Sequence, residues 1–195
     1  MAVSPKQHAQ LLIVEEDSFG GKFLIALPSL QGDFFQHTIT LVIDHSDSGA
    51  FGLVINKTAD LNLSDLVSTD FNLPPAQLPV LLGGPVEQDH LYFLHSTEKS
   101  YTDSYCINGD VTLTTSAELL DDLSREQAPE NMMALMGYAG WAAGQLESEV
   151  SRDAWLIAPF EKDVLFSTPL AERPVIAARN MGVDLNLIIG DTRQH

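Results

Sequence analysis

The sequence predicts a single α+β domain. The chain has 195 residues, of which 45% are hydrophobic and 19% are charged. This length is typical of one domain, and the composition excludes collagen-like, coiled-coil and wholly disordered chains. Short β-branched runs alternate with segments that open on helix-capping residues, and this mixture indicates both strands and helices.

Strands dominate the first third of the chain. Residues 1–20 are expected to form an N-terminal arm, and residues 21–195 are expected to form the domain. The first strands are expected at residues 23–27, 38–43 and 50–55. A turn at residues 46–49 separates the last two strands, so we expect a hairpin. The runs are apolar at successive positions, which predicts that part of the sheet is covered on both faces.

The rest of the chain mixes strands and helices. Further strands are expected at residues 90–95, 111–114, 132–138, 154–157 and 164–166. Helices are expected at residues 64–69, 115–125 and 140–151, and in a last region that begins at Pro169. The helix at 115–125 opens on Thr115 and Glu118 at capping-box spacing. Pro174 is expected to interrupt the last helical region, and Gly182 to end it.

The charge is strongly one-sided, because 10 basic residues stand against 27 acidic ones and give a formal net charge of −17. Residues 58–151 contain 15 acidic residues and only two basic ones, Lys99 and Arg125. Binding to nucleic acid or to an anionic membrane depends on clustered Lys and Arg, which the sequence does not contain. Solubility explains most of the acidity, and the functional alternative is a basic partner protein.

The sequence predicts a cytoplasmic protein that binds no membrane. No run reaches the ~18–20 apolar residues that a membrane-spanning helix needs. The longest uncharged, apolar-rich run, residues 132–145, is broken by three glycines. The N-terminal residues have neither the basic start nor the long apolar stretch of a secretory signal.

The most informative stretch is the glycine-rich segment 137–150, in which an apolar strand is followed by a turn and a helix. A helix that began at Gly140 would offer unpaired N–H groups to an anion or phosphate. The spacing Gly-x-x-Gly-x-x-x-Gly differs from the dinucleotide and P-loop motifs, and no Lys is nearby. The favoured interpretation is close packing of the helix on the sheet, with Gly144 leaving room for a neighbour.

A ligand site on this segment would bind a small molecule or a nucleotide. Its candidate residues are Gly140, Gly144, Ser29, Asn56 and His95. A second glycine cluster, Gly83–Gly84, fits either a ligand-facing turn or, more often, a sharp bend between strands.

No catalytic residue, metal site or cofactor is predicted. The six histidines show none of the spacings typical of a local metal site. Asp44 and His45 are neighbours in a strand, so their side chains are expected to point to opposite faces. Cys106 would form a thiolate pair with His95 if the fold joined them, but a lone Cys is more often an inert buried thiol.

Several blocks of sequence occur in a characteristic order. They are residues 23–29, 49–56, 83–86 with 94–96, 137–147, 153–156 and 165–169. Together these blocks resemble the AlgH/YqgE family of small bacterial cytoplasmic proteins, and the resemblance covers about residues 21–190.

The resemblance implies one domain of strongly coiled, branching and mostly antiparallel β-sheet, packed with a few helices. It implies no agreed enzymatic activity, and a proposed role in transcriptional regulation without a recognised DNA-binding motif. The chain departs from the family pattern in its longer N-terminal arm, in Ser167 where Asp is common, and in Pro174 inside the last helix. Ser167 argues against an essential carboxylate at that position.

The predicted function is that of a non-enzymatic regulatory or interaction protein, which would affect transcription only indirectly. The expected partner is another protein, a basic one if the acidity takes part. The alternative is a small-molecule or nucleotide-binding protein with weak hydrolase activity. The sequence leaves both a monomer and a homodimer open.

Overall fold

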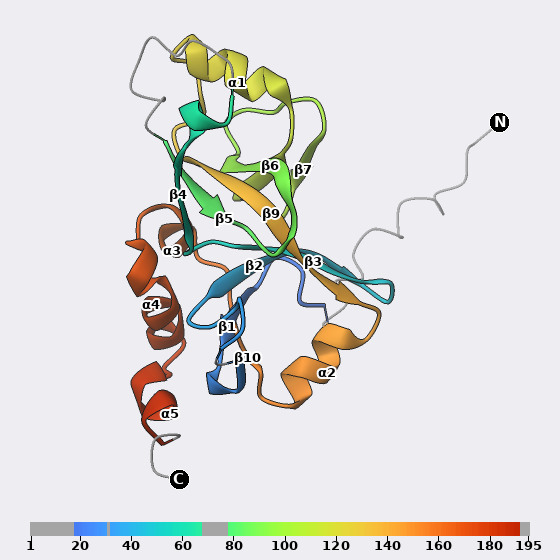
Figure 1. Cartoon of the computed structure of the whole chain (residues 1–195), viewed down its shortest axis with the longest axis vertical. Coiled ribbons are helices and arrows are strands. Elements are labelled where there is room, and N and C mark those ends of the chain that lie inside the picture. Colours follow the sequence, from blue (N-terminus) through green and yellow to red (C-terminus); the bar gives the residue numbers. More distant parts are fainter. Residues whose placement is uncertain (1–17, 31, 68–77, 192–195) are drawn as a thin grey trace, which may run out of the picture.

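The computed structural model describes residues 18–30, 32–67 and 78–191, which form a curled sheet flanked by helices (Figure 1). The strands are β1 (Phe23–Ala26), β2 (Ile39–Ser46), β3 (Gly49–Val54), β4 (Thr58–Asn62), β5 (Pro79–Leu82), β6 (Val86–Ser96), β7 (Ser104–Cys106), β8 (Val111–Thr114), β9 (Met132–Ala142) and β10 (Trp155–Ala158). Their order within the described residues is β10-β1-β2-β3-β9-β6-β8-β7, and β4 joins through β5, which pairs with β9.

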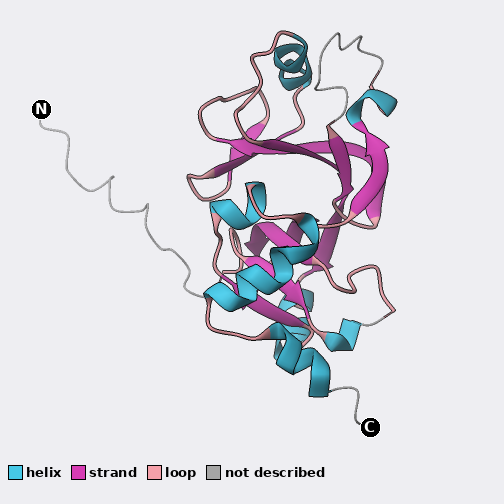
Figure 2. Ribbon diagram, turned by 90° about the vertical axis from the view of Figure 1, so that its left-hand side faces the viewer, coloured by secondary structure: helices cyan, strands magenta, loops and turns pink. Residues whose placement is uncertain are grey.

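The helices lie around this sheet. They are α1 (Ala117–Ser124), α2 (Gln145–Ser151), α3 (Lys162–Phe166), α4 (Arg173–Asn180) and α5 (Leu185–Asp191), with the short 3-10 helices η1 (Pro28–Leu30), η2 (Leu63–Asp65) and η4 (Leu170–Glu172). Figure 2 shows the C-terminal helices in front of the strands at one end of the molecule, with α1 at the far end.

The sheet branches at β9. Its last residues, 139–142, pair antiparallel with β3. Its earlier residues pair with β6 antiparallel and with β5 parallel, so that β5 and β3 pair with different stretches of the same strand. The expectation of a branching, mostly antiparallel sheet in an α+β domain is confirmed.

The branch point requires glycine. Gly83 and Gly84 connect β5 to β6 and lie against the backbone of β9. A Cβ on Gly84 would lie 1.9 Å from the carbonyl carbon of Tyr138, and a Cβ on Gly83 would lie 2.4 Å from the carbonyl oxygen of Gly137. The obstructing atoms are backbone, which cannot rotate away, so this cluster permits close contact between chain segments, as at other strand glycines.

Both faces of the strands near the chain termini are covered, as predicted. In β1, Phe23 and Ile25 belong to the core under α3 and α4, whereas Leu24 belongs to a separate core under α2. Successive strand residues point to opposite faces, which accounts for this division. A third core lies under α1, where Leu119 packs in the same cluster as Phe93 of β6.

Most predicted strands are confirmed, including the hairpin of β2 and β3. The strand predicted at residues 164–166 is wrong, because these residues lie in α3. Val164 and Leu165 are both buried, and a run this short fits a helix and a strand equally well. The backbone N–H groups of Ser167 and Thr168 donate to the Asp163 carbonyl and close the helical turn.

The helix predicted at residues 140–151 begins at Gln145 instead, because Gly140 still pairs with Phe51 of β3. Pro174 does not interrupt a helix. It is the second residue of α4, where its missing N–H has no intrahelical partner to lose. Gly182 follows α4 with a positive φ of 85°, as expected of a residue that ends a helix.

The capping pattern of α1 also differs from the prediction. Ser116, rather than Thr115, is the N-cap and accepts a hydrogen bond from the Glu118 N–H. The Glu118 carboxylate instead accepts hydrogen bonds from the backbone N–H and the hydroxyl of Thr102. Of the helix predicted at 64–69, the structure shows η2 over Leu63–Asp65, and residues 68–69 lie outside the described part. Most of the predicted arm, residues 1–17, also lies outside it.

Candidate functional site

The two glycines of the candidate ligand site have different surroundings. Gly140 lies inside β9, exposed and paired with β3. Gly144 is the N-cap of α2, with a φ of 72° and nothing within 4 Å of an added Cβ. The packing explanation for Gly144 is therefore wrong: its left-handed backbone conformation favours glycine. Glu147 in the first turn of α2 already places a carboxylate at this end of the helix.

The other candidate residues are each held by contacts within the chain. The Ser29 hydroxyl donates to the Asp153 carbonyl. The Asn56 side chain accepts a hydrogen bond from the Ile39 N–H and donates one to the His37 carbonyl. His95 lies opposite Met132 in the sheet, eight residues along β9 from Gly140. That separation is roughly 25 Å in a strand, so the structure does not bring His95 and Gly140 together.

His45 anchors the segment before β1. Its Nδ1 accepts a hydrogen bond from the Phe19 N–H (3.1 Å), and its Nε2 donates to Glu147 of α2 (2.9 Å). The pKa of the Glu147 carboxyl is lowered, chiefly by its own backbone N–H and further by His45. The ring of Phe19 packs on the imidazole, with 4.8 Å between ring centroids. All of these contacts fasten parts of the chain to one another.

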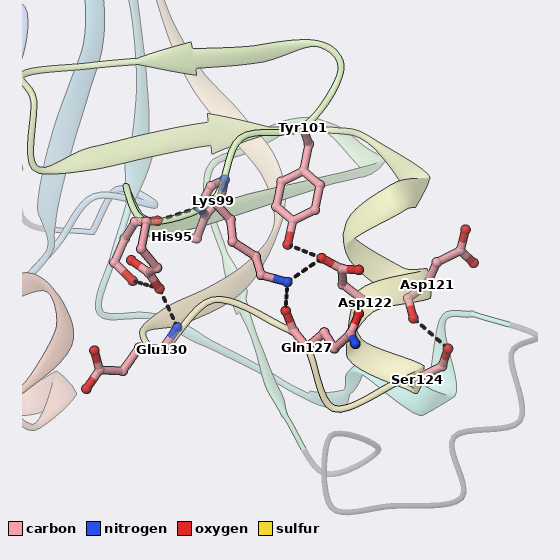
Figure 3. A network of polar contacts seen from close by, with 10 residues as sticks. His95, Lys99, Tyr101, Asp121, Asp122, Ser124, Gln127 and Glu130 are labelled. Carbon is pink, nitrogen blue, oxygen red and sulfur yellow. Dashed lines mark hydrogen bonds and ion pairs between the residues drawn. The ribbon is translucent and has the colours of Figure 1, made fainter.

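A second polar network holds α1 to the segment after β6 (Figure 3). The Lys99 ammonium donates to the Asp122 carboxylate (2.7 Å) and to the Gln127 carbonyl, and the Tyr101 hydroxyl donates to the same carboxylate (3.0 Å). Lys99, and then Tyr101, lower the pKa of Asp122. Burial and Asp122 together raise the pKa of Tyr101. Each charge here is compensated inside the network.

His95 is fully buried next to this network. Its Nδ1–H donates to the Ser96 carbonyl (2.8 Å), and Nε2 has no hydrogen-bond partner among the described residues. Cys106 is exposed, so it is not the buried thiol that the sequence suggested. Cys106 and His95 both pair with Thr112, from opposite sides of β8. Two strand spacings, roughly 10 Å, separate them and exclude a thiolate pair.

The sequence did not predict that a carboxylate accepts hydrogen bonds from two buried tryptophans. Glu149 of α2 accepts hydrogen bonds from the indole N–H groups of Trp141 (2.9 Å) and Trp155 (2.8 Å). Gln145, one turn earlier, donates to the other oxygen of the same carboxylate. The only signal in the sequence is the spacing of four residues between Gln145 and Glu149, which is common on exposed helices.

Sequence analysis also missed Arg173, which is only 6% exposed. Its Nε donates to the Thr168 carbonyl (3.0 Å) and its Nη1 to the Ile55 carbonyl. No carboxylate in the described part of the chain forms an ion pair with it. Arg173 lines a cavity of about 390 Å³ between the sheet and the C-terminal helices.

The charges are divided unequally along the molecule. We define the acidic half as residues 58–67 and 78–131, which carry β4 to β8 and α1, and the helix-covered half as the remaining described residues. The acidic half has twelve Asp or Glu and two Lys or Arg, and the helix-covered half has eleven and six. Most acidic side chains of the acidic half are exposed.

Two classes of feature are absent from the described residues. No group of three or more His, Cys, Asp or Glu side chains there is arranged to hold a metal ion. No described helix is both long enough and apolar enough to cross a membrane.

A family model and individual relatives indicate the same family for this chain. The AlgH-like family model matches residues 23–186. A UPF0301 protein of Thioalkalivibrio sulfidiphilus is 39% identical over 177 residues, which are 89% of this chain and 95% of that protein. A UPF0301 protein of Nitrosospira multiformis is 39% identical over 169 residues, which are 84% and 90% of the two chains.

Solved structures agree with this fold. The solution structure of the AlgH protein from Pseudomonas aeruginosa has a TM-score of 0.74 at 34% identity, over 97% of this chain and 96% of that one. A Corynebacterium diphtheriae crystal structure has a TM-score of 0.70 at 21% identity over 87% and 90%, which supports the fold alone. With a family model spanning most of its length and relatives of this identity, the chain belongs to the AlgH-like family.

Proposed function

We propose that this protein is a non-enzymatic, cytoplasmic regulatory or interaction protein whose acidic half binds a basic partner protein. Any effect on transcription would pass through that partner, because the acidic surface repels nucleic acid. The observation that carries the proposal is the charge of the acidic half, where twelve acidic residues stand against two basic ones. Such a surface steers a positively charged partner and selects against negatively charged ones.

The internal polar contacts support the same proposal. His45, which sequence analysis considered for chemistry, binds Glu147 of α2 and the Phe19 backbone. Lys99 is neutralised by Asp122, so the main cation of the acidic half does not offset the exposed carboxylates around it. The exposed carboxylates are therefore left to interact with solvent or with a partner.

The experiment compares two variants of equal charge. Asp89→Asn, Asp110→Asn and Asp121→Asn together remove three exposed carboxylates from the acidic half. The control removes three from the helix-covered half: Asp33→Asn, Asp47→Asn and Glu172→Gln. Proteins are co-precipitated from nuclease-treated cell extract, and the affinity of each identified partner is then measured with purified components.

We expect a basic partner that binds the wild type and the control alike, with weaker, less salt-sensitive binding to the acidic-half variant. The proposal is contradicted if no protein is retained, or if the two variants lose the partner equally.

A further inference from the structure

We propose that the cavity beside Arg173 binds a small monocarboxylate with an apolar body. This goes beyond the protein-binding role above and involves different residues. Arg is almost never buried as deeply as Arg173 unless a carboxylate or another anion compensates its charge. In this chain the side chain is 6% exposed, and no described carboxylate pairs with it.

The guanidinium still has hydrogen-bonding capacity. It carries five N–H groups, and the described residues accept two hydrogen bonds from it, one from Nε and one from Nη1. The other N–H of Nη1 and both of Nη2 have no protein acceptor there. These groups form the end of the guanidinium fork, which matches the two oxygens of a carboxylate. Burial lowers the pKa of Arg173 only to about 10, so the side chain is cationic at neutral pH.

The cavity has the size and the walls of a small-molecule site. Its volume of about 390 Å³ lies within the range of known ligand pockets. Met133 of β9, which packs in the core under α3 and α4, lines it on the side of the sheet, and Phe166 and Leu170 line it on the side of the helices. An apolar body would lie against these side chains while its anionic end reaches Arg173.

Charge balance favours a carboxylate over a phosphate. Arg173 contributes one positive charge, which one carboxylate neutralises, whereas a dianionic phosphate would bring an excess negative charge into a buried site. Glu130 also lines the cavity, and its exposed carboxylate opposes a second negative charge. The methionine and phenylalanine walls offer no donor to a phosphate, and Asn131, which also lines the cavity, adds only an uncharged amide.

The methionine methyl groups provide a direct test. Protein labelled with ¹³C at the methionine methyls is titrated separately with hexanoate, phenylacetate, 1-hexanol and inorganic phosphate. Met133 packs in the core under α3 and α4, so its signal reports on the cavity, whereas Met132 packs in the core under α1. The signal of exposed Met181 is an internal control. We expect saturable shifts of Met133 with both carboxylates, and binding about tenfold or more weaker for 1-hexanol and for phosphate.

Variants separate binding from folding. Arg173→Met should abolish the carboxylate-induced shifts, and Arg125→Met, at an exposed site outside the cavity, should leave them unchanged. Leu170→Trp is expected to fill the cavity and block binding while the guanidinium is kept. It provides the test if the Arg173→Met protein does not fold. Glu130→Gln should strengthen carboxylate binding, because it removes a like charge at the cavity.

Four results would overturn the assignment. They are the absence of shifts with either carboxylate, equal binding of 1-hexanol and hexanoate, phosphate binding as strong as that of the carboxylates, and carboxylate-induced shifts that persist in the folded Arg173→Met or Leu170→Trp protein.

Discussion

The least exposed cation of each half makes different contacts. In the acidic half, Lys99 donates hydrogen bonds to the Asp122 carboxylate and the Gln127 carbonyl. The excess negative charge of this half lies on exposed carboxylates. In the helix-covered half, Arg173 is more deeply buried, bonds only to carbonyls among the described residues and lines a cavity.

This difference distinguishes charged groups that are paired within the chain from charged groups that are available to a ligand. A carboxylate that is already bonded to a cation in the chain offers little to a partner. A buried guanidinium without an anion, or a surface of carboxylates without nearby cations, is incomplete until something binds. This difference is the basis for proposing a protein-binding role for one half and a small-molecule site for the other.

The largest expected effect comes from the glycines that join the halves. Gly84→Ala would place a Cβ within 2.3 Å of three backbone atoms of β9. The backbone must move, so we expect a loss of about 3 kcal/mol or more of unfolding free energy, and loss of the cooperative transition in a denaturant melt. In Gly20→Ala the nearest atom lies at 3.4 Å, and this control should unfold like the wild type. A stable Gly84→Ala protein would show that the halves do not depend on this contact.

A smaller effect is expected inside the acidic half. Asp122→Asn removes the charge that holds Lys99 and Tyr101, and should lower the unfolding free energy at pH 7 by about 1.5 kcal/mol. Asp121→Asn changes the same charge on the exposed side of α1 and should cost almost nothing.

The pH dependence gives the sign of the Asp122 contribution. Because the folded state lowers the pKa of Asp122 below its ordinary 3.8, the carboxylate stabilises the protein above that value. Its contribution is lost as the pH falls through 3.8 towards the folded pKa. Denaturant melts from pH 7 to pH 2 should show that wild type and Asp121→Asn lose this contribution to the unfolding free energy at acid pH. Asp122→Asn, which lacks the contribution, should not show this loss. Equal acid loss in all three would contradict the network.

Gly144 should show a still smaller effect. Its positive φ makes an alanine there strained, although the space beside it is open, and we expect Gly144→Ala to cost about 1 kcal/mol. Asn tolerates this conformation better, so Gly144→Asn should recover part of the loss. Chemical denaturation of the two variants measures the difference. A stabilised Gly144→Ala protein would show that backbone conformation does not explain this glycine.

The smallest expected effect concerns nucleic acid. We expect no sequence-selective binding of duplex DNA at physiological salt, because the acidic half carries only two basic residues. A gel-shift assay that found selective, salt-sensitive binding would show that the acidic half does not determine the choice of partner.

The sequence predicts most strands of this fold, although not β4, β5 and β7. The apolar and β-branched composition of the runs at β1, β2 and β3 indicates strands from the sequence alone. The start of α2 could not be predicted, because the pairing of Gly140 with Phe51 joins residues that are distant in the chain. The helix at Val164 could not be predicted because a short apolar run is ambiguous.

The site was harder to predict than the fold. A histidine or a glycine in a motif suggests a functional site, yet His45 and Gly144 have structural roles here. His45 bonds to the chain before β1 and to α2, and Gly144 is the N-cap of α2. Arg173 has no unusual neighbours in the sequence, and its burial depends on residues as distant as Ile55. That no carboxylate of the described residues pairs with it appears only when the side chains of the sheet and the C-terminal helices are in place.

Photo-crosslinking in cells tests most directly whether the acidic half is the binding surface. A benzophenone amino acid is placed at Tyr105, which is 49% exposed on β7, or at Leu187, which is 71% exposed on α5 in the helix-covered half. We predict that ultraviolet light joins the Tyr105 variant to a basic protein, with no such adduct from the Leu187 variant. Adducts from Leu187 alone, or an equal pattern from both positions, would contradict the central claim.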